Sequence, residues 1–150
     1  MEKADWPALL PAGVHRKTLT ELANLAVVPF DSPRRDELFA RLSVYLPAVA
    51  AFGCLVEAWV GGSFLTEKQN PDDIDLMLLL DFARVDAMPV AHQQALVVLL
   101  DRDVAKQRYR LDSYLEGHTD RDHRAYWRGL FGFAHDETTP KGIVVIEPPV

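Results

Sequence analysis

Hydrophobic positions recur at helical spacing in several parts of the chain. Between 33 and 52 they return every three to four residues, which predicts a helix that starts at Ser32-Pro33. The run Thr18-Leu19-Thr20-Glu21 has the spacing of a capping box and predicts a shorter helix over 18–27. Two more helices are expected, one over 89–107 with Leu96, Val97, Leu100 and Val104 inward, and one over 119–131 with Thr119 as its cap.

Shorter apolar runs predict the strands. Residues 55–60 form one such run, and residues 74–80 form another that is apolar on both faces and therefore central in a sheet. Further strands are expected over 109–115 and 143–146. Because helices alternate with strands, we expect an α/β or α+β fold with one mixed sheet of about four to five strands flanked by helices.

The remaining segments fit a single domain over 1–150. Residues 1–16 contain prolines and are expected to form an irregular strap on the surface, and residues 134–141 form a polar loop. No repeat, low-complexity segment or long linker divides the chain, and 150 residues is an ordinary length for one domain. Trp127, Tyr126, Leu130 and Phe131 share helical spacing, which favours core or interface packing over base stacking.

Composition narrows the class of partner and the compartment. Apolar residues make up 49% and charged residues 25%, which are ordinary globular values, and the net charge of −6 argues against a broad DNA-binding surface. The one cysteine, Cys54, lies among apolar residues and is expected to be a buried, inert thiol. With no internal disulfide, no signal peptide and no apolar stretch long enough for a bilayer, we expect a cytoplasmic protein without a membrane partner.

Two aspartates introduce the central strand and carry the first functional signal. Asp73 and Asp75 are two residues apart, so both side chains point to one face of the strand. Two close carboxylates repel each other, and a shared proton or a divalent cation relieves that repulsion. The alternative is that both aspartates are solvated at the strand end or accept hydrogen bonds from loop amides.

A third carboxylate is expected from a neighbouring strand. The best candidate is Asp112, which lies inside a strand-like segment where aspartate is disfavoured. Its role would be to complete a metal site and to help deprotonate an acceptor hydroxyl. The alternative role is a salt bridge to Arg110 or Arg108, and Glu116 is a weaker candidate for the third ligand.

Small residues upstream of the aspartates suggest a phosphate-binding turn. Gly61, Gly62 and Ser63 are followed by nine residues and then Asp73, and glycines let backbone amides approach a phosphate closely. Lys68 and Lys141 are candidates for phosphate contacts, against the alternative that they are solvated. The chain also carries a basic stripe at helical spacing, formed by Arg121, Arg124 and Arg128, which is either solvated or faces an acidic partner or a nucleic-acid end. The five histidines do not have the spacing of metal ligands: His15, His92, His118, His123 and His135.

Residues 62–75 read Gly-Ser-Phe-Leu-Thr-Glu-Lys-Gln-Asn-Pro-Asp-Asp-Ile-Asp, and this segment resembles the signature of the DNA polymerase β-like nucleotidyltransferase superfamily. The wider chain is similar to a small bacterial family of nucleotidyltransferase-like proteins, through Gly13-Val14-His15 and Lys141-Gly142-Ile143 as well. The resemblance implies a minimal nucleotidyltransferase fold, with Ser63, Asp73 and Asp75 at nucleotide and metal positions. It also implies that the chain departs from larger members, which carry an added helical domain for the base and the acceptor.

The leading hypothesis is an enzyme that uses Mg²⁺ or Mn²⁺ to move a nucleoside monophosphate from a nucleoside triphosphate such as ATP to an acceptor hydroxyl. Asp73, Asp75 and Asp112 would hold the metals. Small members of related bacterial systems act as antitoxins or phage-defence components, so a protein or RNA acceptor is favoured, and a partner chain or a homo-oligomer could complete the site. The first alternative is a non-catalytic binding module with this fold, an antitoxin or regulatory subunit, and the second is a phosphohydrolase.

Overall fold

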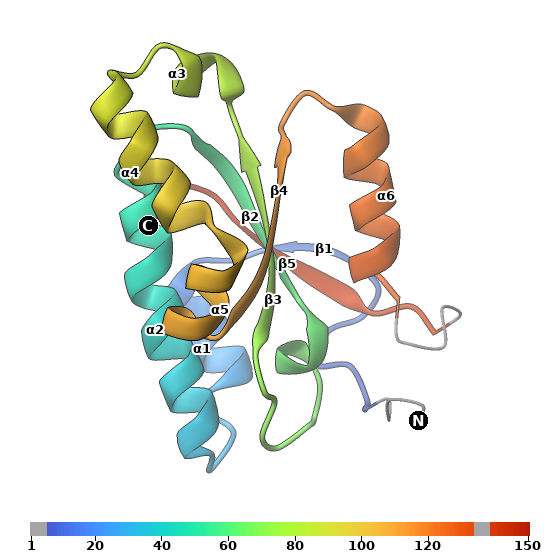
Figure 1. The fold of residues 1–150 in the computed structure, drawn as a ribbon. Coiled ribbons are helices and arrows are strands. Elements are labelled where there is room, and N and C mark those ends of the chain that lie inside the picture. The colour runs from blue at the N-terminus through green and yellow to red at the C-terminus, as the bar shows by residue number, and fades with distance from the viewer. Residues whose placement is uncertain (1–5, 134–138) are drawn as a thin grey trace.

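The helices pack around one five-stranded sheet (Figure 1). The structure is a computed structural model, and it describes residues 6–133 and 139–150. The strand order is β1-β5-β2-β3-β4. The β1/β5 and β3/β4 pairs are parallel, whereas β2 pairs antiparallel with both β3 and β5. The expected mixed sheet is therefore confirmed, with strands β1 (Gly13–Arg16), β2 (Leu55–Gly61), β3 (Ile74–Leu80), β4 (Leu111–Gly117) and β5 (Gly142–Ile146).

Helices cover the two faces of the sheet unequally. The helices α1, α2, α4 and α5 lie on one side, and α6 lies alone on the other (Figure 1). Their bounds are α1 (Leu19–Ala26), α2 (Pro33–Ala50), α3 (Phe82–Asp86), α4 (Val90–Leu100), α5 (Arg102–Tyr109) and α6 (Arg121–Phe131), with a 3₁₀ turn η1 (Gly62–Leu65). No helix in the described part of the chain combines the length and the apolar character needed to cross a bilayer.

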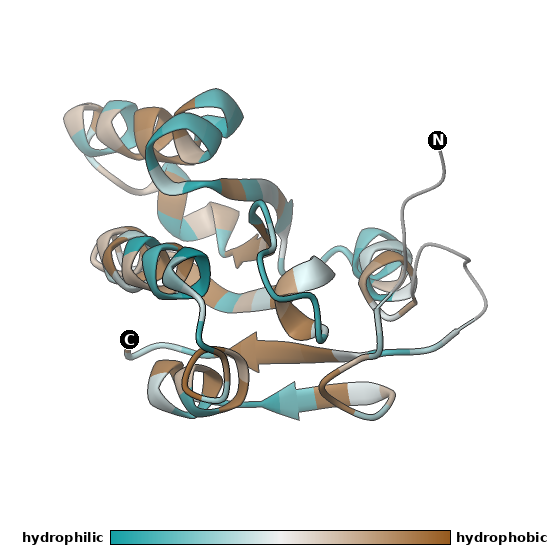
Figure 2. Cartoon of the chain, turned by 90° about the horizontal axis from the view of Figure 1, so that it is seen from below, coloured by the Kyte–Doolittle hydropathy of each residue, from teal (hydrophilic) through white to brown (hydrophobic). Residues whose placement is uncertain are grey.

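Each face of the sheet has its own apolar core. The larger core joins strand residues such as Leu76 and Leu78 to α1, α2 and α4, and the smaller core joins Met77 and Leu79 to α6 through Phe131. Consecutive residues of β3 thus contribute to opposite cores, as expected for a strand that is buried on both sides. In Figure 2 the hydrophobic colour is concentrated in the central strands, whereas the helices alternate in colour. Cys54 is buried, as expected, and this burial raises the pKa of its thiol.

The two predicted helix starts are confirmed. The Thr18 side chain accepts a hydrogen bond from the Glu21 amide, and the Glu21 carboxylate accepts one from the Thr18 amide. Ser32 caps α2 by accepting from the Arg35 amide, and Pro33 is the first residue of the helix. These local signals are reliable because a capped helix end satisfies its own unpaired amides.

The single helix expected over 89–107 is wrong. The segment forms α4 and α5, which are separated at Asp101, and the Asp101 carboxylate accepts hydrogen bonds from the Asp103 and Val104 amides at the start of α5. An aspartate that caps a new helix interrupts the old one. Val97, which was expected to face inward, is 67% exposed, whereas Leu96 is buried.

Three boundary predictions also need correction. Gly13–Arg16 is not part of an irregular strap but the edge strand β1, and it is mostly exposed, so it lacks the apolar pattern of a buried strand. Asp120, not Thr119, caps α6, because its carboxylate reaches the His123 amide. Strand β4 begins at Leu111, two residues later than expected, and the polar loop expected over 134–141 lies partly outside the described residues.

Candidate functional site

Three aspartates converge at one end of the β3/β4 pair. Asp75 and Asp112 lie opposite each other in the parallel register of these strands, and Asp73 directly precedes β3. One carboxylate oxygen of each of the three residues lies within 4.8 Å of those of the other two, and all three residues are partly buried. The structure therefore brings the predicted trio together, and it selects Asp112 over Glu116 as the third member.

Gly62 brings the chain backbone against this cluster. It has φ +77°, a left-handed conformation that favours glycine, and it opens the η1 turn directly after β2. A Cβ atom built on Gly62 would lie 2.4 Å from Oδ2 of Asp75. The preceding Gly61 is equally enclosed, because a Cβ there would lie 2.9 Å from the Phe131 ring of α6. Both glycines are therefore required by close approach of other groups, and Gly62 also by its backbone conformation.

Asp112 has protein partners of its own. Its Oδ1 accepts a hydrogen bond from Arg102 at 2.8 Å, and its Oδ2 accepts one from the Tyr114 hydroxyl at 3.2 Å. The Arg102 guanidinium also stacks over the Tyr114 ring, 4.3 Å from the ring centroid. The predicted alternative, a salt bridge to Arg110 or Arg108, is wrong, because Arg110 pairs instead with Glu37 on α2.

The pKa shifts around Asp112 follow from these contacts. The hydrogen bond to Asp112 raises the pKa of the Arg102 guanidinium. Burial, followed by the charge of Asp112, raises the pKa of the Tyr114 phenol. Both groups thus stay protonated near neutral pH and act as hydrogen-bond donors to the carboxylate.

Arg35 fixes the segment between the glycines and the aspartates. Its guanidinium is buried and donates to the carbonyl oxygens of Phe64, Thr66 and Lys68, and also to that of Ala26 on α1. It lies over the Phe30 ring, 3.7 Å from the centroid. Burial lowers the pKa of Arg35 to about 10. The sequence does not predict this role, because an arginine in the first turn of an amphipathic helix is expected to face solvent.

The other predicted phosphate contacts are distributed around the site. Ser63 lies in η1, where its carbonyl accepts from the Thr66 amide and hydroxyl. Lys68 takes part through its backbone carbonyl, which accepts from Arg35, and through its amide, which donates to Thr66. The Lys141 amide donates to the Gly132 carbonyl, directly after α6, and Lys141 precedes β5. Val144 of β5 pairs with Val60, so the start of this antiparallel strand lies toward the Gly61 end of β2.

The donor set of the trio suits a hard divalent cation. Carboxylate oxygens are the ligands that Mg²⁺ and Mn²⁺ prefer, and both ions bind proteins through one or two carboxylates together with substrate phosphates. Asp73, Asp75 and Asp112 supply three such groups, and the glycine turn leaves no side chain between the backbone and Asp75. The residues therefore fit a magnesium-and-phosphate site.

A second acidic cluster lies at the far end of β4. Glu116, Asp120 and His123 each place one ligand atom within 4.8 Å of the others. His123 lies 3.0 Å from both carboxylates, and Glu116 also accepts from the Trp127 indole. The hydrogen bond to Glu116, followed by the charge of Asp120, raises the pKa of His123. Histidine spacing alone did not predict this cluster, because Glu116 comes from a strand and His123 from a helix.

The aromatic residues of α6 are only partly in the core. Phe131 is 5% exposed and Trp127 packs on the Tyr114 ring, with centroids 4.5 Å apart, as the packing interpretation expected. Tyr126 and Leu130 are more than half exposed, so they do not belong to the core, and interface packing stays a prediction for them. The arginine stripe is not simply solvated, because Arg124 lies 3.6 Å from Glu57 on β2.

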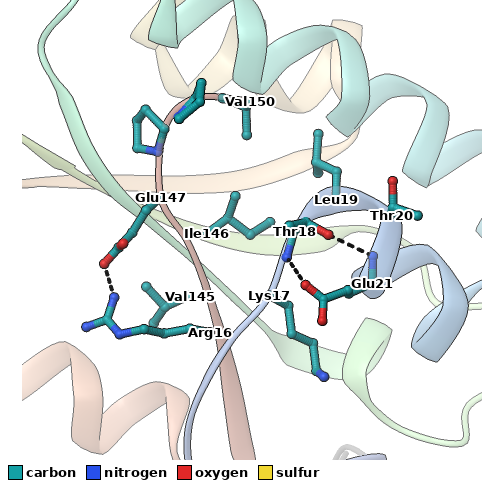
Figure 3. Close-up of a pocket in the computed structure, with 12 residues that line it drawn as sticks. Arg16, Lys17, Thr18, Leu19, Thr20, Glu21, Val145, Ile146, Glu147 and Val150 are labelled. Carbon is teal, nitrogen blue, oxygen red and sulfur yellow. Dashed lines mark hydrogen bonds and ion pairs between the residues drawn. The ribbon is translucent and has the colours of Figure 1, made fainter.

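One cavity in the described part of the chain lies away from the aspartates. It has a volume of about 600 Å³ and lies between the start of α1 and the C-terminal residues 145–150 (Figure 3). Two pairs of its lining residues are bonded to each other: Thr18 to Glu21, and Arg16 to Glu147. None of the three aspartates lines this cavity.

Comparison with known proteins identifies a family but no activity. No curated protein and no solved structure matches the chain. A family model matches residues 4–147, nearly the whole chain, and its description is "Family of unknown function (DUF6932)". The five strands, the six α-helices and the aspartate trio all fall within the matched region. On the strength of this match the chain belongs to the DUF6932 family.

Proposed function

We propose that the protein is a magnesium-dependent nucleotidyltransferase, as the resemblance of residues 62–75 to that superfamily implies. The observation that carries the proposal is the convergence of Asp73, Asp75 and Asp112 from two strands beside the Gly62 turn. Three partly buried carboxylates with oxygens within 4.8 Å of one another repel each other, and a divalent cation relieves that repulsion. Arg102 offsets part of that charge at Asp112.

The chain would contribute positioning and proton transfer to this reaction. Asp73 and Asp75 would hold the divalent cation, which when bound neutralises phosphate charge and stabilises the leaving group. Backbone amides of the Gly62–Ser63 turn would hold the triphosphate. An acceptor hydroxyl oxygen attacks the α-phosphorus, the bond between the α-phosphorus and the bridging oxygen breaks, and pyrophosphate leaves. Asp112 would take the hydroxyl proton, since its carboxylate is the member of the trio on the neighbouring strand.

The direct test is transfer of a labelled α-phosphate. The protein is incubated with each of four α-labelled nucleoside triphosphates, Mg²⁺ and a lysate of its own host, and label on protein and on RNA is separated on gels. We expect transfer that disappears in Asp75→Asn and with a chelator but persists in Asp86→Asn, an exposed aspartate on α3. Free labelled monophosphate without a labelled acceptor would identify a phosphohydrolase instead. Absence of any divalent-dependent triphosphate binding by calorimetry would refute both reactions.

A non-catalytic binding module is the second candidate, and the contacts of Asp112 favour it. Both oxygens of this carboxylate accept hydrogen bonds, from Arg102 and from Tyr114. A carboxylate whose two oxygens both accept hydrogen bonds from protein groups can stabilise the fold without a metal ion. If this candidate holds, a partner retained from the host lysate binds Asp73→Ala and the unmodified protein equally, and no label is transferred to it.

A further inference from the structure

A smaller cavity lies on the α6 face of the sheet and is lined by arginines. Its volume is about 300 Å³, and its walls come from β1, β2, β5 and α6. We call it the arginine pocket, and it is defined by Arg16, Arg121, Arg124, Arg128, Glu57 and Trp59. Trp59 and two valines provide an apolar floor, and Trp59 is only 4% exposed. None of the three aspartates of the proposed metal site lines this cavity.

The charges around the arginine pocket do not balance. Glu57 lies 3.8 Å from Arg16 and 3.6 Å from Arg124, so one carboxylate serves two guanidinium groups. Arg16 also pairs with Glu147, at the boundary with the larger cavity (Figure 3). Arg121 and Arg128 form no ion pair with any residue in 6–133 or 139–150. Among the described residues, four arginines thus meet two carboxylates, which leaves two positive charges in a chain whose net charge is −6.

We propose that the arginine pocket binds the terminal phosphate of a phosphate monoester, with the organic part of the ligand on the apolar floor. A phosphate monoester carries a charge of about −1.5 to −2 near pH 7, which matches the two excess positive charges, whereas a carboxylate carries one charge. The planar guanidinium group donates two parallel hydrogen bonds to phosphate oxygens, and all four cations in the pocket are arginines. A cavity of about 300 Å³ is large enough for a compact ligand such as a nucleoside monophosphate.

This site is independent of the proposed transferase reaction. Arg121, Arg124 and Arg128 line the pocket, whereas Trp127 of the same helix packs on Tyr114 beside Asp112. The ligand would be held by guanidinium groups and needs no divalent cation. Binding can therefore be measured in a chelator, which removes the proposed triphosphate site from the measurement.

The test follows the indole resonance of Trp59 by NMR in the full chain, titrated with AMP in the presence of a chelator. We expect a saturable shift of this resonance. The double substitution Arg121→Gln/Arg128→Gln should weaken the affinity about tenfold or more, because hydrogen bonds to charged groups are lost. These two arginines form no ion pair with a described residue, so we expect the fold to be unchanged. The matched control, Arg108→Gln on the exposed surface of α5, should bind as the unmodified protein does.

Additional ligands identify which part of the monoester is recognised. The affinity for inorganic phosphate, compared with that for AMP, shows whether the phosphate group alone is recognised. The affinity for a 5′-phosphorylated dinucleotide shows whether a nucleic-acid end enters the pocket. The same dinucleotide without its 5′-phosphate should bind much more weakly than the phosphorylated form. Equal binding of these two dinucleotides, an unchanged affinity in Arg121→Gln/Arg128→Gln, or tighter binding of an acidic peptide than of AMP would overturn the proposal. Asp75→Asn should abolish transferase activity but bind AMP in the chelator as the unmodified protein does. The two proposals can therefore fail separately.

Discussion

Gly62 lies so close to Asp75 that a Cβ atom on the glycine would be 2.4 Å from Oδ2 and 3.1 Å from the Cβ of the aspartate. The contact joins the turn after β2 to the first part of β3, although twelve residues separate the two positions. Neither residue alone makes a phosphate site. Together they place a glycine turn directly against a carboxylate, which is the arrangement that the proposed function requires.

Gly62→Ala should remove function with a modest loss of stability. The new methyl group would displace the Asp75 side chain, and φ +77° costs a non-glycine residue roughly 1–2 kcal/mol. We expect divalent-dependent triphosphate binding to fall below detection by calorimetry, while thermal unfolding remains cooperative. Gly129→Ala is the control, because a Cβ there meets nothing within 4 Å and alanine favours the helix by about 1 kcal/mol. Normal triphosphate binding by Gly62→Ala would contradict a role for this turn.

Arg102→Gln should strengthen cation binding. Arg102 neutralises Asp112 at 2.8 Å and is itself 60% exposed, so its contact with Asp112 competes with a metal ion. Removing it frees Oδ1 and makes the site more acidic, and we expect Mg²⁺ or Mn²⁺ affinity to rise about tenfold, the equivalent of one charge-assisted hydrogen bond. Isothermal calorimetry with Mn²⁺ measures the change, with Arg108→Gln as control. Weaker or unchanged cation binding would show that Arg102 does not compete for Asp112.

Arg35→Met should be strongly destabilising. The buried guanidinium satisfies four carbonyl oxygens, three of them in the segment between the glycine turn and the aspartates. Methionine keeps much of the volume but leaves these acceptors without a donor, and we expect a loss of about 3 kcal/mol or more in unfolding free energy. Denaturant unfolding measures it, with the neighbouring Arg34→Gln as control. Among the described residues Arg34 makes one ion pair, to the exposed Asp72 at 3.8 Å, and its loss should change stability by less than about 1 kcal/mol.

The features that the sequence predicted correctly are those with a local cause. The capping box at Thr18 and the Ser32-Pro33 start act within one turn of helix, and the apolar run 74–80 identifies the central strand by itself. Asp73 and Asp75 share a face through strand periodicity alone. Convergence with Asp112 was a sound expectation, because adjacent parallel strands place their starting residues side by side.

The features that the sequence did not predict depend on contacts between distant segments. Arg102 reaches Asp112 only because α4 ends before Asp101 and a separate helix, α5, leads from there into β4. The role of Arg35 depends on carbonyl oxygens about thirty residues away, and β1 is an exposed edge held by its pairing with β5. No periodicity within one segment carries this information.

The His123 cluster should make stability depend on pH in a predictable direction. Glu116, followed by Asp120, raises the pKa of His123 in the folded state above its value in the unfolded chain. The stabilising contribution is therefore fully present below the unfolded value of about 6.5 and is lost as the pH rises through the folded value. Thermal unfolding of His123→Gln and of the unmodified protein should thus differ more at pH 5.5 than at pH 8.5. His92→Gln, on the exposed surface of α4, serves as the control, and its difference from the unmodified protein should be smaller at pH 5.5. A His123→Gln difference that grows toward pH 8.5 would mean that the neutral imidazole, and not the cation, is the form held by Glu116 and Asp120.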